Sequence, residues 1–169
     1  MLARAPDLAA AKESDSGKHD WKLEDKDLNF ALFQKVGRRW TIKLTFQDGK
    51  QEASGRFENR VLRCDEEGAV VLTRFYGPSG KLVVAAKLAI EFTPEFEALL
   101  QPAPNAEKKG EETVKVAGRK WICDVYTMKL EGGVEGEEWM SRDMPGLRLK
   151  SSAMKGGRKI AFELTEFKD

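Results

Sequence analysis

The chain of 169 residues carries 29 basic and 28 acidic residues, so its formal net charge is only +1. Such a balance supplies no long-range field for nucleic acid or an anionic membrane surface. No apolar run reaches the roughly 20 residues that a bilayer-spanning helix needs. Hydrophobic residues make up 41% of the chain and charged residues 34%, which is typical of a folded domain with a charged exterior.

The first 22 residues lack hydrophobic periodicity and are rich in Ala, Lys, Asp, Glu and Ser. We expect a mobile tail over residues 1–22 and a single domain over residues 23–169. The apolar stretch from Leu8 to Ala11 is much shorter than the roughly 7–15 residues of a secretory signal. No signal peptide is therefore visible, and the sequence leaves open whether the protein is cytosolic or an export segment has been removed.

Two short helices are predicted. Over residues 27–36, apolar residues recur four apart, and Gly37 follows as a residue that tolerates a positive φ. Over residues 94–101, the hydroxyl of Thr93 precedes a proline suited to the first helical turn, and an apolar face follows.

Alternation of apolar and polar residues predicts strands over most of the remaining chain. The clearest runs cover residues 40–46, 82–92 and 160–165, and turn sequences such as QDGK, GPSG and KGGR separate the strands. The charged residues 105–112 are expected to form a connection rather than a strand. About eight or nine strands joined by short turns indicate a mainly β fold, a single antiparallel sheet with two short helices on part of one face.

Residues 120–130 form a run that is apolar on both faces, with Trp121 and Cys123 on one face and Ile122 on the other. This pattern indicates a central strand that is covered on both sides. Cys64 and Cys123 are interpreted as buried core residues, with one disulfide between two strands as the alternative. Neither cysteine lies in a CxxC motif or near a histidine, so no zinc site is expected.

Enzyme chemistry is not expected from this sequence. The only histidine, His19, lies in the predicted tail, so a Ser-His or Cys-His pair is improbable. Adjacent carboxylates such as Glu111 and Glu112 point to opposite faces of a strand and do not converge on one substrate. Basic residues are interleaved with acidic ones, so no basic stripe for nucleic acid emerges. We therefore expect no catalytic residue, no metal and no cofactor.

The segment EEWMSRDMPGLRLKSS, residues 137–152, reads as a strand, a turn and a returning strand. Pro145 and Gly146 suit the two central positions of a type II turn. With EETVKVAGRKWICDVY before it and KIAFELTEF after it, this segment resembles the closing part of uncharacterised bacterial envelope proteins similar to the LolA/LolB lipoprotein-carrier superfamily. The matching residues are Glu112, Val114, Val116, Cys123, Trp139, Ser141, Pro145, Gly146, Leu147, Lys150, Leu164 and Phe167.

The resemblance covers about the last third of the chain and implies a strongly curved sheet, a half-barrel, with helices on its concave side. It also implies an exported protein of the periplasm or cell envelope, because the carriers are exported and hold acyl chains on that side. No catalytic residue comes with this resemblance.

Two functions follow as hypotheses. The first is a non-enzymatic envelope protein that binds a lipid or another apolar ligand on the concave face. The candidate contact residues are Trp139, Trp121, Phe96 and Leu100. The alternative is a protein–protein interaction module that uses an exposed sheet edge or face and takes no small-molecule ligand. An open apolar cavity on the concave face would favour the carrier, whereas a face filled by side chains would favour the module.

Overall fold

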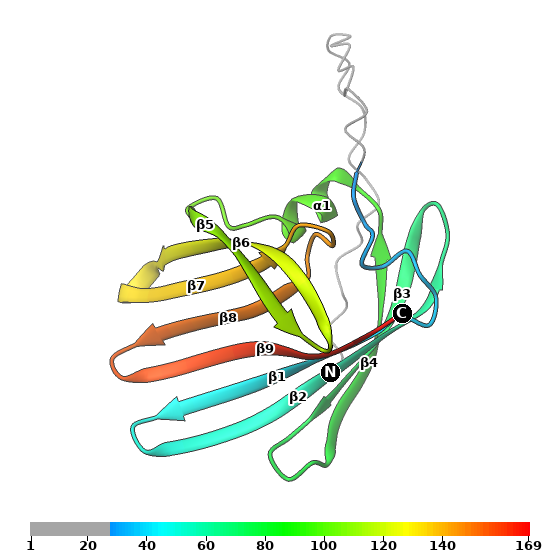
Figure 1. Cartoon of the computed structure of the whole chain (residues 1–169). Coiled ribbons are helices and arrows are strands. Elements are labelled where there is room, and N and C mark those ends of the chain that lie inside the picture. The colour runs from blue at the N-terminus through cyan, green and yellow to red at the C-terminus, as the bar shows by residue number, and fades with distance from the viewer. Residues whose placement is uncertain (1–27) are drawn as a thin grey trace, which may run out of the picture.

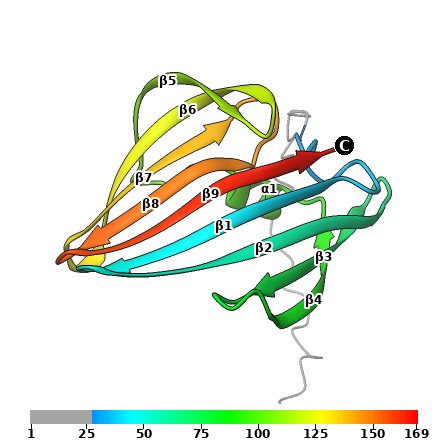
Figure 2. The ribbon, with the colours of Figure 1, turned by 60° about the horizontal axis from the view of Figure 1, so that its bottom comes forward.

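The computed structural model describes residues 28–169, which form one nine-stranded antiparallel sheet (Figure 1). The strand order is β4-β3-β2-β1-β9-β8-β7-β6-β5, and the sheet curves without closing into a barrel (Figure 2). This confirms the predicted fold class. The elements are β1 (Arg39–Asp48), β2 (Gln51–Cys64), β3 (Gly68–Tyr76), β4 (Leu82–Glu91), α1 (Pro94–Leu100), β5 (Glu107–Val116), β6 (Arg119–Leu130), the 3-10 turn η1 (Glu131–Gly133), β7 (Val134–Ser141), β8 (Arg148–Lys155) and β9 (Arg158–Lys168).

The first and last strands meet in the middle of the sheet. Hairpins join the other neighbours, whereas β1 pairs with β9 through a register that sets Arg39 opposite Lys168. The two edges, β4 and β5, therefore come from the middle of the sequence, and the segment containing α1 connects one edge to the other. Tight hairpins explain this order, because short turns keep sequential strands adjacent.

The register defines two faces of the sheet, because residues opposite each other on neighbouring strands point the same way. Ile42 lies opposite Phe57 of β2 and Leu164 of β9, on the face that also carries Trp40. We call this the Trp40 face. The other face carries Thr41 and is called the Thr41 face.

An aromatic cluster covers one end of the Trp40 face. The ring of Phe33 packs edge-on against Trp40 at 6.1 Å between centroids, and Phe96 of α1 packs against Phe33 at 5.8 Å. Phe30 stacks on Phe92 at 4.5 Å. The helix is thus held on the sheet through rings, and such pairs add about 0.5–1.5 kcal/mol each beyond the area that they bury.

Of the two predicted helices, the one after Thr93 is confirmed, and the Thr93 hydroxyl accepts the Phe96 amide at 3.1 Å as its cap. The prediction of a helix over residues 27–36 is wrong within the described residues, since residues 31–37 form turns and bends. The buried Arg38 explains the difference, because its guanidinium donates to the carbonyl groups of Ala31 and Leu32. Those carbonyls are held by a side chain instead of by a helical turn. The predicted tail, residues 1–22, lies outside the described residues.

Two further expectations need correction. Residues 107–112 belong to β5 rather than to a connection, because an edge strand exposed on most of its surface accepts charged side chains. Strand β6 is covered fully on one side only: Trp121 and Cys123 are completely buried, whereas Ile122 is half exposed. Cys64 and Cys123 are both free thiols, so the disulfide alternative does not hold; Cys123 is buried as predicted, whereas Cys64 is only partly buried.

Candidate functional site

The structure places the four predicted ligand contacts in packed surroundings. Trp121 has no exposed surface and lies edge-on to Phe167, with ring centroids 5.0 Å apart. Phe96 belongs to the aromatic cluster, and Leu100 packs against the backbone of Gly146. Trp139 and Phe96 are half-buried, whereas Trp121 and Leu100 are buried.

Trp139 sits between two charged side chains. Its indole N–H donates to Glu112 at 2.7 Å, and the Lys150 ammonium group lies 5.8 Å from its ring. All three residues belong to the motif that resembles the envelope proteins. The contacts join β5, β7 and β8, so this part of the motif has a structural explanation that needs no ligand.

The turn at the centre of the same motif has the predicted geometry. The Leu147 amide donates to the Met144 carbonyl at 3.0 Å, and Gly146 has a φ of +88°, as a type II turn requires. The Ser141 hydroxyl accepts the Met144 amide at 3.2 Å. The turn is therefore a rigid support for the end of α1, because Leu100 packs directly on Gly146.

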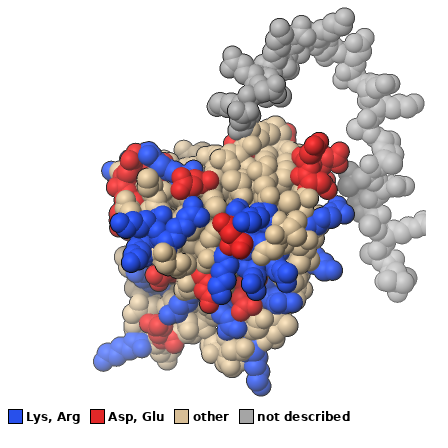
Figure 3. All heavy atoms as spheres, turned by 45° about the vertical axis from the view of Figure 1, so that its right-hand side comes forward, with Lys and Arg blue, Asp and Glu red and all other residues tan. Residues whose placement is uncertain are grey.

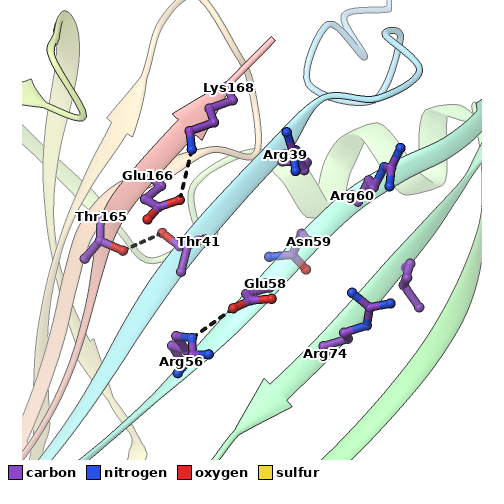
Figure 4. Close-up of a pocket in the computed structure, with 11 residues that line it drawn as sticks. Arg39, Thr41, Arg56, Glu58, Asn59, Arg60, Arg74, Thr165, Glu166 and Lys168 are labelled. Atoms are coloured by element: carbon purple, nitrogen blue, oxygen red, sulfur yellow. Dashed lines mark hydrogen bonds and ion pairs between the residues drawn. The ribbon is translucent and has the colours of Figure 1, made fainter. Parts of the chain in front are cut away.

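A basic groove lies on the Thr41 face and encloses about 340 Å³. Figure 4 views it with α1 behind the sheet. Figure 3 shows basic and acidic side chains interleaved over one side of the molecule. Five cationic and two acidic side chains line the groove, a net charge of +3, together with Thr41, Asn59, Leu72 and Thr165. The charged residues are Arg39, Arg56, Arg60, Arg74, Lys168, Glu58 and Glu166.

A second hollow of about 650 Å³ lies near η1 and the β8–β9 turn. Its charged lining is balanced, with three carboxylates and three ammonium groups: Glu107, Glu135, Glu137, Lys109, Lys129 and Lys159. None of the four predicted ligand contacts lines this hollow or the basic groove.

An apolar surface that no other element of residues 28–169 covers lies on the Trp40 face, away from the aromatic cluster. It continues across β9, β1, β2, β3 and β4 through directly opposed pairs such as Phe46–Ile160 and Phe75–Val84. Its most exposed members are Val84 at 54% and Leu88 at 50%. We call this surface the open apolar face: Leu44, Phe46, Phe57, Phe75, Val84, Leu88, Ile160 and Phe162.

Titratable groups with shifted pKa values are tied into structural contacts. Partial burial by itself would raise the pKa of Asp124, but hydrogen bonds from Lys108 at 2.9 Å and Arg142 at 2.8 Å, together with their charges, lower it overall. Burial raises the pKa of the Cys123 thiol to about 11, so it stays protonated at neutral pH and is a poor nucleophile. Within residues 28–169, no three His, Cys, Asp or Glu side chains are grouped to hold a metal ion.

None of the helices in residues 28–169 combines the length and apolar character needed to cross a membrane. No protein-family model and no curated protein sequence matches the chain.

Solved structures resemble this chain at low sequence identity. A provisionally assigned lipoprotein from Parabacteroides distasonis gives a TM-score of 0.57 at 13% identity, over 85% of this chain and 100% of that chain. A chain of the MucA/MucB complex from Pseudomonas aeruginosa gives 0.46 at 18% identity, over 78% of this chain and 51% of that one. A provisionally assigned outer membrane lipoprotein-sorting domain from Vibrio parahaemolyticus gives 0.30 at 9%, over 79% and 85%. The first match shows a shared fold, and this chain spans about half of the chain matched in the MucA/MucB complex.

The amino-acid sequence did not predict the basic groove or the open apolar face. The groove draws its residues from four strands, so its cations are far apart in sequence and interleaved with acids. Only the pairing register reveals that they share one face. The strand at residues 82–92 was recognisable, but its position at the sheet edge depends on the full strand order.

Proposed function

We propose that this protein is a non-catalytic protein-interaction module of the cell envelope, which docks an extended segment of a partner along the free edge of β4. The observation that carries the proposal is the exposure of β4: all residues from 82 to 89 are exposed although most of them are apolar. The envelope location rests on the resemblance of residues 111–167 and is supported by the shared fold.

The edge of β4 is a suitable template for strand addition. Within residues 28–169, β4 pairs with β3 alone, so one side of its backbone remains available there to N–H and C=O groups of another strand. Proteins usually protect such edges with charges, prolines or bulges. Here the register shift at Val83 is one such bulge, and Lys87 is the single charge between residues 82 and 90. The protection is therefore weak.

The open apolar face extends the docking surface inward from this edge. Val84 lies opposite Phe75, which lies opposite Phe57, so a partner strand beside β4 would meet a continuous apolar surface. Exposed apolar surfaces of this kind mark interaction sites. Alternating apolar residues in the partner would bury both this surface and their own, while backbone hydrogen bonds set the register.

The apolar-ligand hypothesis finds less support in the geometry. The basic groove and the second hollow are lined largely by charged and polar side chains, whereas the exposed apolar residues spread over an open surface. Small-molecule sites usually enclose most of their ligand. Trp121 and Leu100 would have to leave packed positions to reach one.

Site-specific photo-crosslinking tests the proposal in the source organism. A photoreactive residue in place of Val83 should give a defined adduct with a partner, and the same residue in place of Leu99 should not. Replacing Val84 and Leu88 by Lys should abolish the adduct, because charges would enter the apolar interface.

The matched control replaces Val36 and Leu99 by Lys. These residues are 58% and 71% exposed and lie outside β4, so the variant carries the same added charge and loses the same number of apolar groups. Adducts that persist in the edge variant, or that disappear equally in both variants, would contradict docking at β4.

A further inference from the structure

The basic groove contains like charges directly opposite one another across three strands. Arg39 of β1 lies opposite Lys168 of β9 on one side and opposite Arg60 of β2 on the other. Because neighbouring strands lie about 4.8 Å apart, three cationic side chains start within about 10 Å of one another. Like charges in this arrangement destabilise a sheet, so the row costs the fold some stability.

Few acids within the described residues offset this row. Neither Arg39 nor Arg60 forms an ion pair in residues 28–169, and Lys168 reaches only Glu166, at 3.8 Å. Arg74 of β3 is likewise without an ion-pair partner in this part of the chain. By contrast, Arg56 is held by Glu58 at 2.9 Å. Figure 4 shows the same arrangement, with dashed contacts at Glu58 and Glu166 and none at the three other arginines.

The next row along the strands limits the size of an anion that can bind. There Thr41 lies opposite Glu58 on β2 and Glu166 on β9. A long polyanion laid along the strands would meet both carboxylates, whereas a compact anion over the Arg39 row avoids them. The groove thus selects against extended acidic peptides.

We propose that this groove binds the phosphate group of a small phosphate ester or of a phospholipid head group. Guanidinium groups match phosphate oxygens through paired N–H donors. A volume of about 340 Å³ accommodates a group of this size, and Leu72, opposite Arg60, offers an apolar neighbour for the organic part. Bound phosphate removes the repulsion within the row, so binding stabilises the fold. The site is independent of β4.

Thermal unfolding in inorganic phosphate tests the site, with chloride at equal ionic strength to account for general screening. Wild-type protein should melt at a higher temperature in phosphate than in chloride. Arg39→Gln should melt at a higher temperature than wild type in chloride, because the central like charge is gone. It should also need at least tenfold more phosphate for the same shift. A merely structural role of Arg39 predicts the opposite change in chloride.

Arg158→Gln is the matched control, since Arg158 lies at the other end of β9 and its loss changes the net charge equally. It should keep the wild-type phosphate response. Co-sedimentation with phosphatidylglycerol vesicles tests the lipid source of the phosphate group, and phosphatidylcholine vesicles, whose phosphate is balanced by an ammonium group, serve as the comparison. Binding to phosphatidylglycerol vesicles that is lost in Arg39→Gln and kept in Arg158→Gln assigns the head group; a response to free phosphate without vesicle binding assigns a soluble ester.

Three results would overturn the proposal. One is no phosphate-specific shift together with no difference between the two vesicle types. Another is an equal loss of response in Arg39→Gln and Arg158→Gln. The third is tighter binding of a polyglutamate peptide than of phosphate, which would assign the groove to an acidic protein segment instead.

Discussion

Gly146 offers a direct test of how the β7–β8 turn supports α1. Its φ is +88°, and a Cβ placed there would lie 2.7 Å from Cδ2 of Leu100 and 3.4 Å from the Cβ and Cγ of that residue. Gly157, in the β8–β9 turn, has a similar φ of +81° with no atom within 4 Å of such a Cβ. Substitutions at Gly146 and Gly157 therefore share the backbone strain, and only the substitution at Gly146 adds a packing clash.

Gly157→Ala should lower the free energy of unfolding by about 1 kcal/mol, because an L-residue is disfavoured in the left-handed region. Gly146→Ala should lose the same amount and roughly 1–3 kcal/mol more, since Leu100 must move within a packed site. Urea unfolding followed by tryptophan fluorescence measures both values. Adding Leu100→Ala to Gly146→Ala should reveal a favourable coupling of the two substitutions in a double-mutant cycle.

Equal losses in Gly146→Ala and Gly157→Ala would refute the reasoning. They would mean that Leu100 yields without cost and that α1 does not depend on the turn beneath it. Absence of coupling between Gly146 and Leu100 would lead to the same conclusion.

Three further outcomes follow from the described contacts. Arg148→Ala should destabilise the protein by about 1–3 kcal/mol in urea unfolding, because it leaves the carboxylate of Glu138 buried without its 2.7 Å partner. In native protein at pH 8, a thiol reagent such as DTNB should modify Cys64 before Cys123, whose pKa of about 11 keeps it protonated; equal rates before unfolding would contradict this. Because the pKa of Asp124 is lowered on folding, its ionised form stabilises the native state above the ordinary pKa of 3.8, and this contribution is lost as the pH falls through the folded value. Asp124→Asn should therefore reduce stability at pH 7, with a difference from wild type that shrinks towards pH 2 in urea titrations.

Local sequence patterns predicted the strands well because period-two alternation depends only on neighbouring residues. The helix at residues 94–100 was also predictable, since Thr93 and Pro94 act within one turn. The prediction of a helix over residues 27–36 failed because Arg38, just beyond that range, donates to carbonyl groups that a helix would use. The apolar spacing alone could not reveal that competition.

The residues of the candidate sites come together only through strand pairing, so local sequence patterns could not predict these sites. Arg39, Arg60 and Lys168 become neighbours only once β1 is placed between β2 and β9. Trp121 and Phe96 were reasonable aromatic candidates, but composition does not show whether a ring packs in a core or lines a surface. The strand order is needed to tell a ring that packs in the core from a ring that lines a surface.

The two sheet edges differ in a way that limits how many molecules could join through them. β5 carries six charges in ten residues, at Glu107, Lys108, Lys109, Glu111, Glu112 and Lys115, whereas β4 carries two, at Lys87 and Glu91. A sheet with two receptive edges can grow into a fibre by repeated addition, as amyloid does. With β5 charged, the proposed addition at β4 would join one partner and then stop. The charges on β5 would thus prevent repeated strand addition, so the exposed apolar edge at β4 would not lead to fibrils.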